Sequence, residues 1–167
     1  LDGISICTPP CLHHEILMAA LDRGVHALCE KPFTTSSRLA REVAAKARER
    51  GLVAAPAYKR HFYPVFVEAR SLLDSGRLGR LVFFRNLFAG RHNMEGRWFS
   101  DSSRSGGGAF FDAGCHSVEL ALSFMGDIRR VAFANGTFAQ AIEVEDAGMA
   151  LLKAESGAVG TVAASWS

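Results

Sequence analysis

The chain has 167 residues, 49% hydrophobic and 22% charged, so it can bury a real core and is neither disordered nor fibrous. Its 19 lysine and arginine residues against 17 acidic residues give a net charge of +2, which gives no reason to expect nucleic acid or an anionic membrane surface as a partner. No apolar stretch approaches the length of a membrane span, so no membrane association is expected.

The first part of the chain alternates short apolar runs with helical patterns. Strands are predicted at Leu1–Cys7, Val25–Cys29 and Leu52–Ala55. Helices are predicted at Leu12–Arg23 and from the cap Ser36 to Arg50, each followed by a glycine that can end it. This alternation is typical of right-handed crossovers in a parallel sheet, so residues 1–57 are predicted to form half of a doubly wound α/β domain.

The pattern changes from residue 58 onwards. A helix is predicted at Pro64–Ser75, a strand at Leu81–Phe88, a long loop at Arg91–Ser105 and a single long helix at Gly106–Met125. Three strand-like runs follow at Arg130–Phe138, Val144–Lys153 and Ala158–Ser165. Short connections favour antiparallel pairing, so residues 58–167 are predicted to form an α+β domain with a mainly antiparallel open sheet that is incomplete at its C-terminal end.

The cysteines do not indicate a disulfide framework. They are Cys7, Cys11, Cys29 and Cys115. Because they are few and irregularly spaced, free thiols and a cytoplasmic location are expected. Two of them cluster with His13 and His14, but four ligands within eight residues match no familiar zinc pattern, so no metal site is expected. The chain has no leader and starts at Leu1 rather than Met, which predicts that it begins inside a longer protein.

Glu30, Lys31 and Pro32 follow the second predicted strand. In an open parallel sheet, ligands bind outside the carboxyl ends of the strands, so this position directs Lys31 toward a binding crevice. Pro32 biases Lys31 toward an extended backbone and thereby fixes the direction of its side chain. The alternative is an ordinary solvated lysine paired with Glu30.

Asp112 and His116 lie four residues apart in the predicted long helix. This spacing places both side chains on one face, where a carboxylate can orient an imidazole and stabilise its protonated form for acid–base work. A purely structural pair is the commoner explanation of the same spacing. Cys115 points about 100° away from its neighbour His116, so a thiol–imidazole dyad is not expected.

Other residues suit ligand contacts. Thr8 and the amides of the turn that follows it suit a ribose or a phosphate, although Thr8 also fits as a helix cap. Arg97 and Trp98 could line a sugar site, and Tyr58 and Arg60 lie where the two parts of the chain join. Neither the G-x-G-x-x-G fingerprint nor a P-loop pattern is present in these residues.

Taken in order, these motifs resemble one family, the Gfo/Idh/MocA oxidoreductases, which include glucose–fructose oxidoreductase and inositol dehydrogenase. The matching elements are Thr8-Pro9-Pro10 with His13, Glu30-Lys31-Pro32, Arg60 near Pro64, Gly76-Arg77-Leu78-Gly79, Arg97-Trp98, Gly106-Gly107-Gly108, Asp112 with His116, Glu145-Asp146 and Ser165-Trp166. The resemblance covers essentially the whole chain, and it is the ordered combination that makes it specific.

The resemblance implies a dehydrogenase that exchanges hydride between NAD or NADP and a sugar, a cyclitol or a related alcohol or ketone. It implies that Lys31 orients and polarises the reacting oxygen, that His116 is the acid–base group, and that Asp112 positions the substrate and supports the histidine. The cofactor contacts that it implies are Thr8, Pro9, Pro10, His13, Glu30, Lys31 and Arg60. The implied substrate contacts are Lys31, Arg97, Trp98, Asp112 and His116.

Two features depart from the family pattern. Glu119 stands where members commonly have Asp, and the first strand of the family with its glycine-rich turn is absent from these residues. Leu1–Cys7 therefore matches a later strand, and the first part of the chain corresponds to the C-terminal half of a Rossmann-type domain that binds cofactor poorly by itself.

Two other functions fit the same residues, an NAD-dependent glycosidase of the same superfamily and a non-catalytic sugar-binding or assembly protein. The substrate and the choice between NAD and NADP stay open. An open-faced sheet favours self-association into a homo-oligomer.

Overall fold

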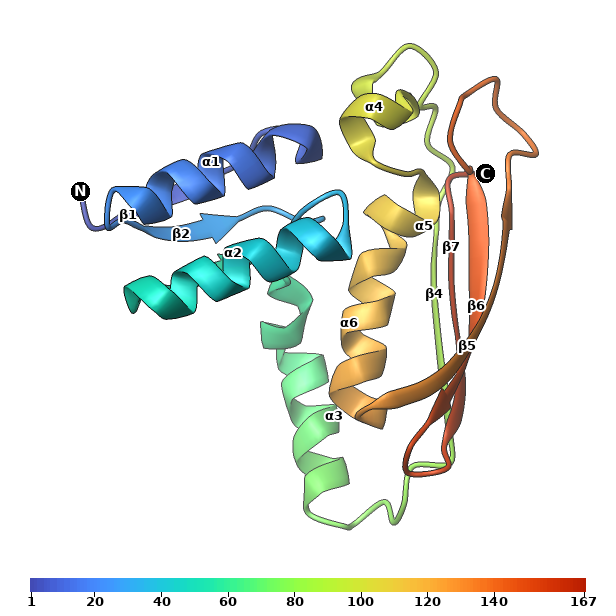
Figure 1. Ribbon diagram of the computed structural model, residues 1–167. Helices are drawn as coiled ribbons and strands as arrows, with labels where there is room; N and C mark the ends of the chain where they lie inside the picture. The colour runs from blue at the N-terminus through green and yellow to red at the C-terminus, as the bar shows by residue number, and fades with distance from the viewer.

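The structure, a computed structural model, describes all residues from Leu1 to Ser167 and contains two separate β-sheets (Figure 1). The first sheet consists of β1 (Gly3–Ile6), β2 (His26–Cys29) and β3 (Ala54–Pro56), which are parallel and lie in that order. Helix α1 (Pro10–Asp22) connects β1 to β2, and α2 (Ser37–Arg50) connects β2 to β3. The predicted alternation of strands and helices in a parallel sheet is confirmed.

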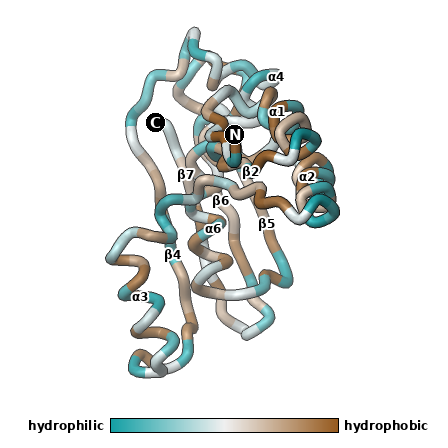
Figure 2. Tube along the Cα trace, turned by 90° about the vertical axis from the view of Figure 1, so that its left-hand side faces the viewer, coloured by the Kyte–Doolittle hydropathy of each residue, from teal (hydrophilic) through white to brown (hydrophobic).

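Local sequence signals fix the ends of α2. The hydroxyl of Ser36 accepts a hydrogen bond from the backbone N–H of Leu39, and Gly51 ends the helix at a φ of 64°, which favours glycine. The helix is mostly hydrophilic along its length, whereas α1 carries more apolar residues (Figure 2). Both helices bury apolar side chains against the sheet in one core cluster: Ile6, Leu17, Leu21, Ala27, Cys29, Val43 and Ala47.

The second sheet is mixed. Its strands are β4 (Phe83–Ala89), β5 (Ile128–Gly136), β6 (Ala147–Ala154) and β7 (Val159–Ser165), and their order is β4-β7-β6-β5. The pairs β5–β6 and β6–β7 are antiparallel, as predicted, while β4 pairs in parallel with β7. The first strand of this part thus lies beside the last one, a topology that adjacent hairpins alone would not produce.

The prediction of one continuous helix at Gly106–Met125 is wrong. The segment begins with a non-helical glycine turn and then forms two helices, α5 (Ala109–Asp112) and α6 (Gly114–Met125), separated at Ala113. Close packing accompanies the break, because a Cβ atom on Gly114 would lie 3.0 Å from the ring of Phe110 and 3.4 Å from Ala164 of β7. The preceding loop also contains a short 3₁₀ helix, Trp98–Ser100, and α4 (Ser102–Ser105).

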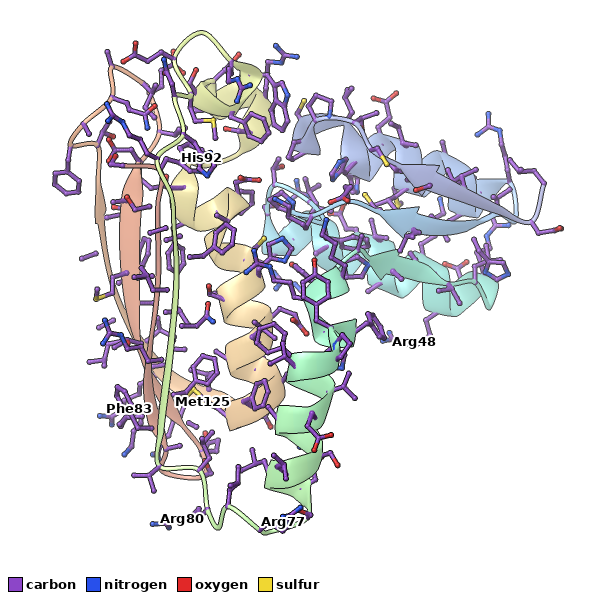
Figure 3. The ribbon with its side chains drawn as sticks, turned by 180° about the vertical axis from the view of Figure 1, so that it is seen from behind. Arg48, Arg77, Arg80, Phe83, His92 and Met125 are labelled. Atoms are coloured by element: carbon purple, nitrogen blue, oxygen red, sulfur yellow. The ribbon has the colours of Figure 1, made fainter.

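Helix α6 covers one face of the second sheet. Met125 lies between this helix and the strands, whereas Phe83 is on the opposite, open face (Figure 3). A buried hydrogen bond of 2.6 Å from the Ser117 hydroxyl to Asn86 Oδ1 of β4 fixes the helix against the sheet. Beside α6 lies α3 (Pro64–Asp74), which follows β3 through a 3₁₀ helix at Lys59–Phe62. Every helix is too short or too polar to traverse a lipid bilayer.

A buried carboxylate holds the loop between β5 and β6. Asp146 is fully buried, and its side chain accepts hydrogen bonds from the backbone N–H groups of Phe138, Ala139 and Gln140 at 2.7 to 3.1 Å. Burial raises the pKa of Asp146, but these hydrogen bonds together outweigh it and hold the pKa below the ordinary value of 3.8. The loop therefore depends on an ionised carboxylate.

We expect Asp146→Asn to lower the free energy of unfolding at neutral pH by about 2 kcal/mol, because at least one buried N–H loses its acceptor. A group with a lowered pKa stabilises the fold above its unfolded-state pKa and loses this effect as the pH falls through its folded-state pKa. The difference between wild type and variant in urea unfolding should therefore shrink below about pH 4, toward the lowered folded-state value. Asp127→Asn, on the surface, is the control, and a pH-independent difference would contradict the explanation.

Candidate active site

The carboxyl ends of β1, β2 and β3 form one edge of the first sheet, and this edge faces α5 and the start of α6 (Figure 1). Thr8 follows β1, Glu30 and Lys31 follow β2, and Tyr58 follows β3. Because the strands are parallel, residues from three separate stretches of sequence are brought to the same edge.

Lys31 reaches from this edge to the second part of the molecule. Its Nζ lies 2.6 Å from Asp112 Oδ1 and donates a second hydrogen bond of 3.1 Å to the main-chain oxygen of Asp112. Both side chains are about four-fifths buried, with exposed fractions of 21% and 19%. The interpretation of Lys31 as a solvated partner of Glu30 is wrong, since the Glu30 carboxylate accepts from the Lys31 backbone N–H instead.

His116 lies in the first turn of α6 and is buried. Its Nδ1 is enclosed and has no hydrogen-bond partner. Burial lowers the pKa of His116 to about 4, with further lowering by the Lys31 and Arg60 cations that Asp112 only partly offsets. The imidazole is therefore neutral at physiological pH.

The expected contact between Asp112 and His116 is not formed. The two residues do not share a continuous helix, because Ala113 separates α5 from α6. The Asp112 carboxylate bonds to Lys31, which the sequence spacing could not reveal because the two residues are 81 positions apart. The spacing of i and i+4 therefore did not predict the partner of the carboxylate.

Arg60 and Phe88 complete the surroundings of His116. The guanidinium carbon of Arg60 lies 3.9 Å from the centroid of the Phe88 ring, and this ring is 6.5 Å from the imidazole. The ring of Tyr58 meets the imidazole edge to face at 6.2 Å. Phe88 was not among the predicted site residues. Strand alternation could have found it, because it lies two residues after Asn86, on the face that contacts α6.

Two further ionisable groups beside the site stay protonated at neutral pH. Burial raises the pKa of Cys115 to about 12 and that of Tyr58 to about 12. The Cys115 thiol donates a hydrogen bond of 3.0 Å to the main-chain oxygen of Asp112. An attacking thiolate at this position is therefore not supported, and no three His, Cys, Asp or Glu side chains come together as metal ligands.

His13 is placed differently from the expectation. It is fully buried, and its Nδ1 and Nε2 lie 2.8 Å from the main-chain oxygens of Pro32 and Thr8. Its ring connects the turn after β1 to the turn that carries Lys31, and both of its nitrogens are used in these contacts. The Thr8 hydroxyl is still available for a cofactor contact, since its oxygen is buried and has no hydrogen-bond partner.

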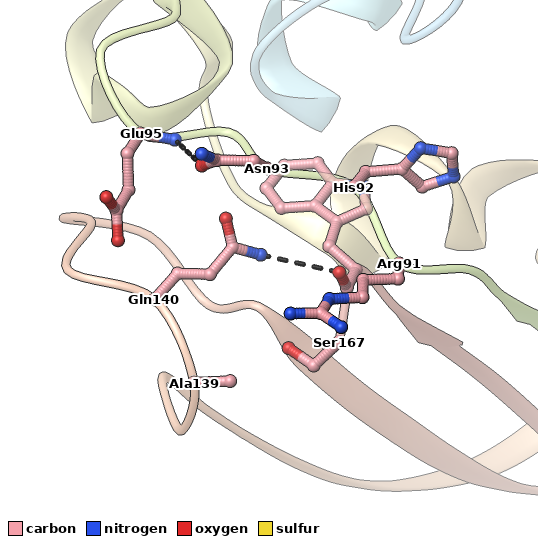
Figure 4. A pocket seen from close by; sticks show the side chains of 8 residues that line it. Arg91, His92, Asn93, Glu95, Ala139, Gln140 and Ser167 are labelled. Atoms are coloured by element: carbon pink, nitrogen blue, oxygen red, sulfur yellow. Dashed lines mark hydrogen bonds between the residues drawn. The ribbon is translucent and has the colours of Figure 1, made fainter.

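No hydrogen bond or ion pair joins Arg97 or Trp98 to Lys31, Asp112 or His116. Arg97 is exposed, and the Trp98 ring stacks on Phe99 with 3.7 Å between centroids. The same loop borders a polar pocket of about 230 Å³ at the end of the second sheet (Figure 4), lined by Arg91, His92, Asn93, Glu95, Ala139, Gln140, Trp166 and Ser167. None of the predicted site residues lines this pocket.

Glu119 of α6 contacts the segment that connects the two sheets. Its Oε1 lies 3.1 Å from His61 Nδ1 in the 3₁₀ helix that precedes α3. Burial raises the pKa of Glu119, although the proximity of His61 opposes that shift. The Glu119 side chain thus bridges α6 to the segment that carries Tyr58 and Arg60.

Two family models match consecutive parts of the chain. Residues 1–58 match the model described as "Oxidoreductase family, NAD-binding Rossmann fold", and residues 66–167 match "GFO/IDH/MocA C-terminal domain". The expectation of a nicotinamide dinucleotide as cofactor is thereby confirmed at the level of the family.

Individual relatives agree with these matches. The chain is 25% identical to a scyllo-inositol 2-dehydrogenase (NAD(+)) of Bacillus subtilis, covering 99% of this chain and 48% of that protein. It is 31% identical to a D-xylose 1-dehydrogenase (NADP(+)) of Haloferax volcanii, with coverages of 99% and 50%. A crystal structure of an NAD binding oxidoreductase from Klebsiella pneumoniae superposes with a TM-score of 0.93 at 29% identity, covering 99% of this chain and 48% of that one.

The chain spans about a third to a half of the length of the curated relatives that it matches. The two consecutive model matches, the parallel sheet and the mixed sheet all agree with the resemblance drawn from the motifs. The chain belongs to the Gfo/Idh/MocA family of oxidoreductases.

Proposed function

We propose that this chain carries the acid–base residues of a dehydrogenase that transfers hydride between NAD or NADP and an alcohol or ketone group of a sugar or cyclitol. The observation that supports this most strongly is the ion pair of Lys31 and Asp112 beside the neutral imidazole of His116. An inositol dehydrogenase and a xylose dehydrogenase among its relatives support the substrate class.

The edge of the first sheet fits a dinucleotide. The buried hydroxyl of Thr8 lacks a partner and could bond to a sugar hydroxyl of the cofactor, and no side chain caps the N-terminus of α1. Glu30, Lys31 and Arg60 lie around the same edge. When bound, the nicotinamide supplies the acceptor or donor of the hydride.

In the proposed reaction, the side chains of the site transfer the proton and stabilise the charge on the reacting oxygen. A neutral His116 accepts the hydroxyl proton on a ring nitrogen when an alcohol is oxidised, and returns it when a ketone is reduced. The Lys31 ammonium stabilises negative charge that develops on that oxygen. The ion pair with Asp112 orients the charged ammonium and keeps it out of solvent.

We also infer that residues 1–57 and 58–167 are two domains, because each sheet has its own core cluster. The open face of the second sheet supports self-association. No helix covers this face, and its exposed apolar side chains alternate along the strands with the residues that face α6. These exposed side chains are Phe83, Leu87, Met149, Leu151 and Val159.

We expect His116 to stay neutral from about pH 8 down to about pH 5 in an NMR titration of its Cε1–H signal, because burial and three cations disfavour the imidazolium. Lys31→Met removes one of these cations and should raise the pKa of His116. A wild-type titration near the ordinary value of 6.5, with no response to Lys31→Met, would contradict the electrostatic description of the site.

We expect Lys31→Ala and His116→Ala to lower the turnover of the holoenzyme by about 10²- to 10⁴-fold, because each removes a group that acts on the reacting oxygen. Turnover is measured as reduction of NAD or NADP with a panel of inositols and aldoses, and circular dichroism checks the fold. Lys153→Ala, a surface substitution far from the site, is the matched control. Rates near the wild-type value for both variants would contradict the roles assigned to Lys31 and His116.

We expect the double variant Met149→Lys/Leu151→Lys to shift the protein from an oligomer to a monomer in sedimentation equilibrium, because each new ammonium would be desolvated in an interface formed by two open faces. Arg48→Glu on α2, away from this face, should leave the mass unchanged. A wild-type protein that is already monomeric at high micromolar concentration would argue against the interface.

A further inference from the structure

Glu145, in the loop between β5 and β6, binds nearly all the free amides at the start of α5. Glu145 Oε2 accepts a hydrogen bond of 2.9 Å from the N–H of Gly108, and Oε1 accepts from Phe110 and Phe111 at 3.1 and 3.3 Å. The main-chain oxygen of Glu145 accepts a fourth bond, of 2.8 Å, from Ala109. The first N–H that finds its partner within α5 is that of Asp112, which donates to the oxygen of Gly108.

Helix α5 depends on this arrangement. A helix of only four residues is not stable by itself, because its nucleation is unfavourable and its terminal amides have no partner within the helix. The carboxylate of Glu145 satisfies those amides and adds a favourable charge at the helix N-terminus. The approach is so close that a Cβ atom on Gly108 would lie 1.9 Å from the main-chain oxygen of Glu145. Only glycine fits there.

Glu145 is itself held rigidly from the other side. It directly precedes Asp146, whose buried carboxylate binds the loop amides and whose main-chain oxygen accepts a hydrogen bond of 2.8 Å from Trp166. The loop between β5 and β6 therefore presents a fixed carboxylate to α5. At the opposite end of the same short helix, Asp112 binds Lys31 through both its carboxylate and its main-chain oxygen.

We propose that Glu145 is a positioning residue: by fixing α5 it sets the place of Asp112 and, through Asp112, the place of the Lys31 ammonium. It acts only through these residues, since its carboxylate is occupied by backbone amides. Its importance for turnover rests on the function proposed above, but the control that it exerts over Lys31 does not.

The test is Glu145→Gln, read without cofactor or substrate. The amide keeps one acceptor oxygen but turns an N–H group toward backbone donors, so hydrogen exchange at Gly108, Phe110 and Phe111 should accelerate about tenfold or more. The ¹³Cε–¹Hε signal of Lys31, assigned with Lys31→Arg, should move toward its position in Asp112→Asn, where the ion pair is broken. Glu143→Gln, a neighbouring exposed glutamate, should change neither reading.

A Lys31 signal that keeps its wild-type position in Glu145→Gln while the α5 amides exchange faster would overturn the proposal, because Glu145 would then cap the helix without acting on the ammonium. Unchanged exchange at these amides would overturn it as well. If Glu145→Gln does not fold, Glu145→Asp is read by the same criteria, since it keeps the charge and shortens the reach by one methylene. A moved Lys31 signal with unaltered turnover in the holoenzyme would count against the proposed function and not against this role.

Discussion

The ion pair between Lys31 and Asp112 is the contact through which the site is assembled. It joins the carboxyl edge of the parallel sheet to the short helix that precedes α6, across 81 residues of sequence. Its two side chains are largely removed from water, and the cost of desolvating charges offsets much of their attraction. Its contribution is therefore more to geometry than to stability, because it fixes where a cation sits relative to His116.

The charges around this pair explain the state of its neighbours. Three cations, Lys31, Arg60 and Lys59, disfavour protonation of the buried imidazole, and the Asp112 carboxylate that opposes them is already engaged by Lys31. The imidazole stays neutral, as a proton acceptor must. Burial likewise keeps the Cys115 thiol and the Tyr58 phenol protonated, so all three groups are uncharged at physiological pH.

Two side chains hold the site in place by binding main-chain atoms. His13 lies between the oxygens of Thr8 and Pro32, and Glu145 binds the amides at the start of α5. Both residues use their polar side-chain atoms to bind the backbone. Side chains that fix two chain segments in this way give a precise placement that loops by themselves do not provide.

The sequence by itself determined the elements and the family. Apolar periodicity, the Ser36 cap and the glycines that end helices predicted the three parallel strands with their two helices, because these signals act within a few residues. The ordered motifs likewise singled out Lys31, Asp112 and His116. Only the tertiary structure decided which atoms meet. The break at Ala113, the pairing of Asp112 with Lys31, the burial of His13 and the position of β4 beside β7 all depend on contacts between distant segments, and no local pattern encodes such contacts.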